Sequence, residues 1–468
     1  MSRVWAVARH TISEGVRMKI ALVFLVLIGL VVLGLPFSIE GDSSLTGAVQ
    51  SFMAYGFSAT ALLLGMVTIF LSRSLSDEVS NRQIFLVMTK PVARWQYIVG
   101  KWLGITLLNA SFLICTTLTI YGMVRYIQRT HPPIDPTYDA AALKNEVLVA
   151  RHAIETKLPN FAREAEAELE RNVEDGLYDN VPNFDPEAEK DRLSKKHEAK
   201  WRIVGPQEAR LFEFENILVD RSPKSLVYLR YKAEVTGYPP DEIYRSRWLF
   251  GNRFKGTPEY EVGTRHMVGR YHNILIPADA VAEDHTLTVR FINQNPHPAE
   301  PQFRNVIEFR KADEVELLFI VGSFEGNLFR LAILMFCKLM FLAAVAILMT
   351  TCFSFPVAAL ASFTVYVLAG ARGFIMDSID FSSADYANML SSPKEFALNS
   401  IAAVYGALGW VIPDFARFDA VDDLVNGRNV SLVWVLQGIS ELGLIKTSIA
   451  LGLAVLLFYR RELAEVSM

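Results

Sequence analysis

The charged residues with the most informative spacing lie between residues 73 and 104, in a stretch flanked by apolar runs at 52–71 and 98–122. Five basic residues stand there against two acidic ones, and such an excess in a short loop beside membrane spans marks the cytoplasmic side. Glu78 precedes Arg82 by four residues, the favourable order for an ion pair on one helical face. Pro91 is expected to end this short helix, because the residue before a proline avoids the helical region. The candidate site residues are Asp77, Glu78, Arg82, Lys90, Pro91, Arg94 and Lys101.

Catalytic and nucleotide-binding motifs are absent from the sequence. A phosphate loop needs GxxxxGK[ST], whose backbone amides and lysine hold nucleotide phosphates, and Gly100-Lys101 lacks the upstream glycine and is followed by Trp102. Neither GxSxG nor HExxH occurs. The chain is therefore not expected to be an enzyme or to carry a cofactor, and any ATP would be bound by a partner subunit.

A metal site is also not expected. The three cysteines lie in or beside apolar runs, and the four histidines between residues 205 and 322 are irregularly spaced without an evident cysteine or acidic partner. These histidines are interpreted as scattered surface residues; they are His266, His272, His285 and His297.

Composition indicates a membrane protein with a substantial soluble part. The chain has 468 residues, is 51% hydrophobic and has a mean hydropathy of +0.25. Its net charge is only −4, so no overall electrostatic field favours nucleic acid.

The apolar runs predict an α-helical polytopic membrane protein with about six transmembrane helices and an inserted α+β domain. Residues 1–19 form an amphipathic interfacial helix. The first membrane half, 20–125, holds three spans and the loop 73–97, whose basic residues mark the cytoplasmic side. The second half, 327–468, holds spans at 328–349, 355–371 and 442–459. Residues 394–412 are expected to form a re-entrant or surface helix on the outer face, so both termini are cytoplasmic and 126–326 is extracytoplasmic.

The inserted domain, 126–326, is predicted to be helical first and β-rich afterwards. Apolar residues recur at helical spacing from Leu143 to Leu169, and Asp185-Pro186 is typical of a helix start, with the acid as N-cap. This helical part covers 138–204. In the β-rich part, 205–322, alternation of apolar and polar residues indicates short strands and a β-sandwich. The predicted strands cover 210–217, 225–235, 245–250, 266–276, 285–293 and 306–320.

Two features inside the spans are ambiguous. Lys338 lies well within the fourth span, where a charge costs about 2.5–3.5 kcal/mol. It is either a contact in a transport pathway or gate, or a lysine that snorkels or pairs across the bundle, and no carboxylate in the spans is an obvious partner. Gly100 and Gly104 form a small-xxx-small pair that permits close helix packing, although chance explains such a spacing equally well.

The charged stretch resembles the first cytoplasmic loop of type-2 ABC transporter permeases. The shared features are an acidic residue at Glu78, a short apolar helix at 84–88, the turn Lys90-Pro91-Val92-Ala93-Arg94, and Gly100-Lys101 at the start of the next span. The tight hairpin from Thr350 to Pro356 is also similar to the inner turn of that family. The resemblance covers the membrane parts and not the insertion between the third and fourth spans.

The resemblance implies a permease subunit that couples ATP hydrolysis by a separate ABC ATPase subunit to export or mechanical work. It implies association with a second permease, as homodimer or heterodimer, within membrane lipid. On this basis Glu78 and Arg82 form the coupling helix, Lys90, Pro91 and Arg94 set its angle, and Lys101 anchors it at the inner interface. Glu78→Lys is then expected to uncouple ATPase stimulation with the spans still folded. The alternative is a membrane-anchored extracytoplasmic binding or sensor protein without transport activity, and a membrane enzyme is the weakest reading.

Overall fold

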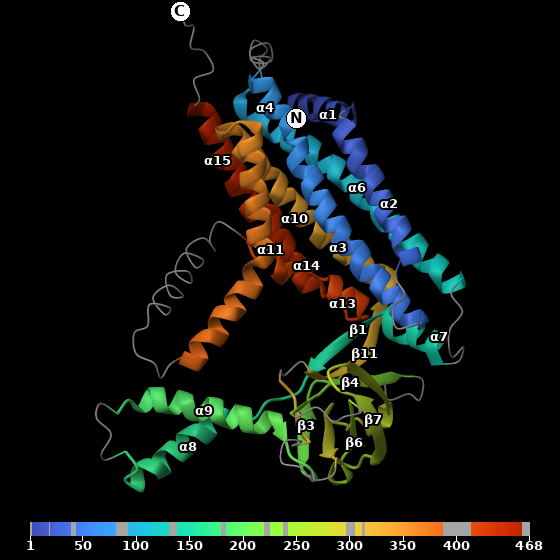
Figure 1. The fold of residues 1–468 in the computed structure, drawn as a ribbon, viewed down its shortest axis with the longest axis vertical. Coiled ribbons are helices and arrows are strands. Elements are labelled where there is room, and N and C mark those ends of the chain that lie inside the picture. The colour runs from blue at the N-terminus through green and yellow to red at the C-terminus, as the bar shows by residue number, and fades with distance from the viewer. Residues whose placement is uncertain are drawn as a thin grey trace, which may run out of the picture. The chain divides into compact units, whose positions relative to one another are not determined.

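The computed structural model describes residues 2–17, 19–38, 44–80, 92–130, 138–178, 184–219, 225–236, 242–295, 305–310, 314–386 and 413–460. The chain forms two compact units: unit 1 comprises Met1–Ala150 and Gly322–Met468, and unit 2 comprises Arg151–Val321 (Figure 1). The expected combination of several apolar helices with a separate β-rich region is confirmed at this level.

Unit 1 is built from long apolar helices (Figure 1). Five described helices are long and apolar enough to cross a membrane, or six if the bent pair at Arg3–Arg17 and Leu22–Leu35 counts as one span. The prediction of six spans and the orientation of the termini therefore remain predictions. The N-terminal helices are α1 (Ser2–Arg17), α2 (Lys19–Ser38), α3 (Leu45–Leu71), α4 (Arg73–Ser80) and α6 (Arg94–Thr130), followed by α7 (Tyr138–Ala142) and η1 (Leu143–Val147).

The C-terminal helices complete the same bundle. They are α10 (Phe324–Cys352), α11 (Phe355–Tyr386), η5 (Ala416–Phe418), α13 (Val421–Val425), α14 (Leu432–Gly438), η6 (Ile439–Lys446) and α15 (Thr447–Arg460). Helix α10 packs against α3, α6, α11 and α15, and is the most buried of the candidate spans. The last apolar helix runs from Leu432 to Arg460, longer than the predicted 442–459, and the predicted outer helix 394–412 lies outside the described residues.

Polar side chains form hydrogen bonds to the backbone at the ends where α3 and α10 begin. Asp139 accepts hydrogen bonds from the backbone amides of Leu45 (2.7 Å) and Thr46 (3.1 Å), which satisfies free N–H groups at the start of α3. Buried Asn327 accepts from the amide of Val430 (2.7 Å) and donates to the carbonyl of Arg428 (2.6 Å). These bonds hold the segment before α14 against the start of α10.

Unit 2 contains two four-stranded sheets that share one hydrophobic core. Their orders are β1-β11-β4-β8 and β3-β9-β6-β7, and a three-stranded sheet has the order β2-β10-β5. Inward residues such as Leu229 and Leu317 from the first sheet and Phe212, Trp248 and Phe291 from the second form the core. The strands are β1 (Val149–Glu155), β2 (Ile203–Val204), β3 (Ala209–Phe214), β4 (Leu226–Lys232), β5 (Glu234–Thr236), β6 (Ile243–Phe250), β7 (Tyr260–Met267), β8 (Tyr271–Pro277), β9 (Leu287–Asn293), β10 (Val306–Glu308) and β11 (Val315–Ser323).

Two charged helices lie between β1 and β2 in the chain, and one of them starts as predicted. Helix α9 (Pro186–Arg202) has Asp185 as N-cap, whose carboxylate accepts from the amide of Glu187 at 3.0 Å, so this helix start is confirmed. It pairs with α8 (Phe161–Glu174) through Lys190–Glu166 (3.3 Å) and Lys196–Glu168 (3.0 Å).

Three secondary-structure predictions are wrong in detail. The helical period from Leu143 to Leu169 is interrupted by β1, because residues 149–155 pair with β11 instead of continuing a helix. The predicted strand 266–276 covers the end of β7 and most of β8, which are joined by a turn at Gly269 with φ +74° and lie in different sheets. The predicted strand 306–320 is likewise two strands, β10 and β11, in different sheets.

Candidate coupling site at the start of α6

Lys101 lies two turns into α6 with its side chain 1% exposed. Its ammonium group donates to Glu78 Oε1 at 2.6 Å, to Glu14 Oε2 at 3.1 Å and to Ser74 Oγ at 3.1 Å. An ammonium group has three hydrogens, so all of them have acceptors. A charge with so little access to water needs such partners, because burial without them is very costly.

Glu78 is held on both of its oxygens. While Oε1 accepts from Lys101, Oε2 accepts from the hydroxyl of Tyr97, which is one turn earlier on α6 and 2% exposed. We name Glu14, Ser74, Glu78, Tyr97 and Lys101 the Glu78–Lys101 cluster. It connects α1, α4 and α6 in the core of the bundle's end.

Arg94 connects the same region to the last helix. Its guanidinium donates to the carbonyls of Phe458 (3.2 Å) and Tyr459 (2.8 Å), and lies 5.5 Å from the Tyr459 ring centroid. A cation at the carboxyl end of a helix satisfies free carbonyls and interacts favourably with the helix dipole. The Tyr97 ring also stacks on Phe458 at 6.0 Å, so α15 joins α1, α4 and α6.

Glycines bring α1 close enough for Glu14 to reach Lys101. A Cβ atom at Gly100 would lie 2.6 Å from the Cβ of Val7, and one at Gly104 would lie 2.6 Å from the Cβ of Thr11 and 2.8 Å from the Ala8 carbonyl oxygen. The spacing of Gly100 and Gly104, which sequence alone left open to chance, is therefore used for close helix packing. As a result α1 buries Ala8 and Thr11 against α6, whereas Trp5 and Val16 of the same helix are exposed.

The predicted site residues divide into three groups. Glu78 and Lys101 come together, and the Lys101 side chain is buried. Asp77 lies on the exposed side of α4 and pairs with Arg73 at 3.1 Å, where both side chains are nearly half exposed. Arg82, Lys90 and Pro91 lie outside the described residues, so the expected Glu78–Arg82 pair and the proline corner stay predictions.

Three members of the cluster were missed from sequence: Glu14, Ser74 and Tyr97. A signal exists for Tyr97, which precedes Lys101 by four residues on one helical face. Glu14 and Ser74 have no local signal, because only the packing of α1 and α4 on α6 brings them to Lys101.

The cluster is better described as an ion-pair network than as a metal centre. His10, Glu14 and Glu78 place ligand atoms within 4.8 Å of one another. The Lys101 ammonium already bonds both carboxylates, so a second cation would compete with a positive charge at the same position.

Lys338 of α10 finds a partner that sequence did not suggest. Its Nζ lies 3.7 Å from Asp419 Oδ1, with Lys338 15% and Asp419 55% exposed. The carboxylate comes from the short segment between η5 and α13 rather than from another span. A role for Lys338 in a pathway stays a proposal.

The interpretation of scattered histidines is wrong for two residues of unit 2. The rings of His266 on β7 and His272 on β8 stack at 4.1 Å across the turn that joins the two strands, and His266 Nδ1 lies 2.5 Å from the Tyr231 hydroxyl. Burial, and then the neighbouring His272, lower the pKa of His266 from 6.5 to about 4. Burial also lowers the pKa of His272. His285 lies apart from them and bonds the Ile217 carbonyl, and His297 lies outside the described residues.

Comparison with known protein families matches residues 5–153 to the family model of the ABC-2 family transporter protein. The matched segment contains most of α1, then α2 to η1, and thus every member of the Glu78–Lys101 cluster. Comparison with curated proteins gave no match.

Proposed function

Residues 5–153 belong to the ABC-2 family of transporter proteins, and from this premise we propose that the chain is the membrane permease subunit of an ABC-type transporter. In this proposal a separate ABC ATPase subunit binds and hydrolyses ATP, and the permease converts the resulting motion into export or mechanical work across the membrane. The chain itself contributes no catalytic residue and no cofactor.

The observation that carries the proposal is the buried Glu78–Lys101 pair of 2.6 Å. Helix α4 follows the span α3 after the single residue Ser72, and Glu78 of α4 is bonded to two residues of the next span, α6. Displacement of α4 would therefore move α3 and α6 together. Breaking such a pair costs about 3–5 kcal/mol, so the connection resists rupture when it is loaded.

In this proposal neighbouring residues of α4 have different roles, which follow from the exposure of their side chains. Asp77 and Arg73 are nearly half exposed and are available for contact with the ATPase, together with the predicted contact residues Arg82, Lys90 and Pro91. Glu78 and Lys101 face inward and would transmit the motion. Arg94 would pass it to α15 through the carbonyls of Phe458 and Tyr459.

The proposal includes the orientation expected from charge. The end of unit 1 that carries α1, α4 and the start of α6 holds an excess of basic residues over acidic ones and would face the cytoplasm. Both termini would then be cytoplasmic and unit 2 extracytoplasmic. The functional unit would contain two permease chains, identical or similar, and Lys338 with Asp419 would lie near the pathway.

A sensor or binding protein is the second candidate. Unit 2 favours it, because its sheets enclose a hydrophobic core of their own and could bind a ligand independently of the spans. The two candidates differ in whether an ATPase with a phosphate loop copurifies with the chain and is stimulated by it.

The coupling proposal is tested with the full chain and its ATPase in lipid nanodiscs. Asp77→Lys is expected to weaken ATPase binding, because it reverses an exposed charge on the docking side. Glu78→Gln is expected to preserve binding but to lower ATPase stimulation about tenfold, because it removes the charged acceptor of Lys101. Glu78→Lys is less informative, because it would place two ammonium groups together in a buried position.

The control is Glu215→Gln, which removes the exposed Lys157–Glu215 pair of unit 2 and should change neither readout. Normal stimulation by a folded Glu78→Gln variant would refute transmission through the cluster. If no ATPase binds the chain, the sensor candidate is favoured.

A further inference from the structure

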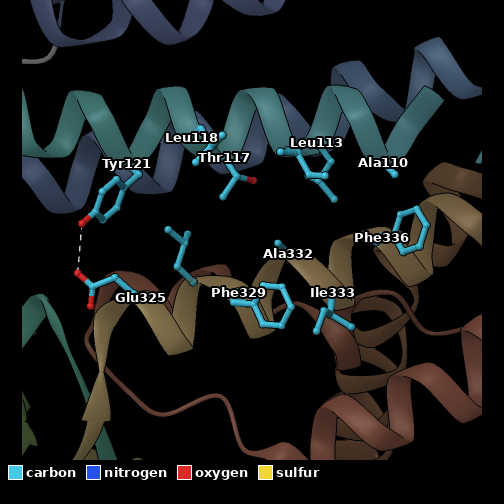
Figure 2. Close-up of a pocket in the computed structure, with 12 residues that line it drawn as sticks. Ala110, Leu113, Thr117, Leu118, Tyr121, Glu325, Phe329, Ala332, Ile333 and Phe336 are labelled. Atoms are coloured by element: carbon cyan, nitrogen blue, oxygen red, sulfur yellow. Dashed lines mark hydrogen bonds between the residues drawn. The ribbon is translucent and has the colours of Figure 1, made fainter. Parts of the chain in front are cut away.

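A groove of about 660 Å³ runs between α6 and α10 in unit 1 (Figure 2). Its walls are aliphatic and aromatic over most of their length, with Leu113, Ile114 and Leu118 from α6 and Phe329, Ile333 and Phe336 from α10. Ile114, Leu118 and Phe329 are 59%, 64% and 67% exposed among the described residues. Both helices are candidate membrane spans, so the open side of this groove would face the acyl chains of the lipid bilayer.

The groove has charged groups at one end only, and along the rest of its described lining Thr117 is the polar residue. The Tyr121 hydroxyl donates to Glu325 Oε1 at 3.2 Å, and Arg125 donates to the same oxygen at 2.9 Å (Figure 2 shows the Tyr121–Glu325 bond). Arg125 is 41% and Glu325 52% exposed, so both charged groups remain accessible. The groove is therefore apolar along its length and carries one cation and one anion side by side at its end.

We propose that this groove binds a glycerophospholipid with a zwitterionic phosphoethanolamine headgroup. One acyl chain would lie between α6 and α10, the phosphate would contact Arg125, and the primary ammonium would contact Glu325. The paired charges select this headgroup: an anionic headgroup would be attracted by Arg125 but repelled by Glu325. A choline headgroup has no N–H to donate to the carboxylate. The site uses residues outside the Glu78–Lys101 cluster, so it stands or fails independently of the coupling proposal.

The test measures fluorescence quenching by phosphatidylethanolamine with brominated acyl chains, added to the purified full-length protein in mixed micelles. Phe329→Trp is the reporter in the groove, and its signal is the difference from the parent protein. Leu360→Trp on α11 is the matched reporter, since Phe329 and Leu360 are both 67% exposed. Quenching at position 329 is expected to saturate at a low lipid fraction, whereas quenching at 360 should rise in proportion to lipid.

Second changes made in the Phe329→Trp protein test each part of the site. Ala332→Phe narrows the groove and should raise the half-saturating lipid fraction about tenfold. Arg125→Gln should raise it by a similar factor, about tenfold. Glu325→Gln should abolish the preference for brominated phosphatidylethanolamine over brominated phosphatidylcholine. Circular dichroism and size-exclusion elution identify variants that have not folded.

Three outcomes would overturn the proposal. Equal, non-saturating quenching at positions 329 and 360 would mean ordinary lipid contact. Protection of position 329 from quenching, with disulfide formation between two Phe329→Cys chains, would mean that a second copy covers the groove. Saturable quenching unchanged by Arg125→Gln and Glu325→Gln would refute the headgroup assignment.

Discussion

At the scale of single residues, Lys101 shows how a buried charge is accommodated. Its ammonium group is 1% exposed and donates to one hydroxyl and two carboxylates that come from two other helices. An apolar side chain of similar size could fill this position with equal stability. The ion pairs therefore contribute mainly to the specificity of the helix packing. The cluster fixes the relative positions of α1, α4 and α6, which a purely apolar contact would leave freer to slide.

Lys101→Met tests this arrangement. The substitution leaves the Glu78 carboxylate buried with only Tyr97 as a donor, and we expect a loss of about 3–5 kcal/mol of unfolding free energy. Thermal unfolding in detergent measures the loss. The double variant Glu78→Gln, Lys101→Met should recover part of it, because position 78 then no longer holds a buried carboxylate without its cation. Lys157→Met removes an exposed lysine and should leave the unfolding temperature unchanged. Equal losses at positions 101 and 157 would contradict the cluster's role.

At the scale of elements, the contact between α1 and α6 depends on the absence of side chains. Gly100 and Gly104 lie one turn apart on α6 and meet Val7, Ala8 and Thr11 of α1. This contact makes α1 part of the helical bundle. It also brings Glu14 within hydrogen-bond distance of Lys101, so this ion pair depends on the close packing of α1 on α6.

Gly104→Ala is expected to destabilise the protein by about 1–3 kcal/mol, because the added methyl group would overlap Thr11 and the Ala8 carbonyl. Gly122→Ala is the matched control, since it lies in the same helix with no neighbour within 4 Å. The control should be neutral or stabilising by up to about 1 kcal/mol through helix propensity. Hydrogen exchange of α1, measured together with thermal unfolding, reports whether the contact loosens. Similar results for the two glycines would show that α1 does not pack as described.

At the scale of the whole molecule, the two units rest on separate hydrophobic cores and should respond differently to acid. His266 in unit 2 has a pKa of about 4, below its ordinary value of 6.5, chiefly because of burial. Between these values the unfolded chain binds a proton that the folded chain does not. The stabilising effect is therefore complete above pH 6.5 and is lost as the pH falls toward 4. The free energy of unfolding falls by at most about 1.4 kcal/mol per pH unit for each histidine, and partial exposure of the ring reduces this loss.

Hydrogen exchange at pH 7 and pH 5, corrected for the intrinsic exchange rate, checks this expectation. Protection of β7 and β8 should fall at the lower pH more than protection of α6 and α10. His266→Gln should reduce the difference, whereas His152→Gln should preserve it, because His152 is exposed and outside the histidine pair. Equal acid sensitivity of the two units would refute a specific contribution from His266.

Sequence patterns alone were sufficient for much of the architecture. Long apolar runs exclude most alternatives to membrane helices, and the Asp185-Pro186 helix start and alternating strands such as β9 are local signals that survive folding. The family of residues 5–153 was likewise evident from short motifs, and the comparison confirms it. Glu78 and Lys101 were identified as important individually, because charged residues between apolar runs are conspicuous.

Long-range packing determined what these signals could not. Residues 149–155 have a helical period but form β1, because pairing with β11 outweighs local preference. The partners of Lys101 come from positions 14, 74 and 78, and the partner of Lys338 lies 81 positions along the chain at Asp419. Likewise, no local pattern predicts that the chain between β7 and β8 turns so that His266 and His272 stack. Such contacts depend on where helices and strands cross in space, and the spacing of residues within one element carries no information about that crossing.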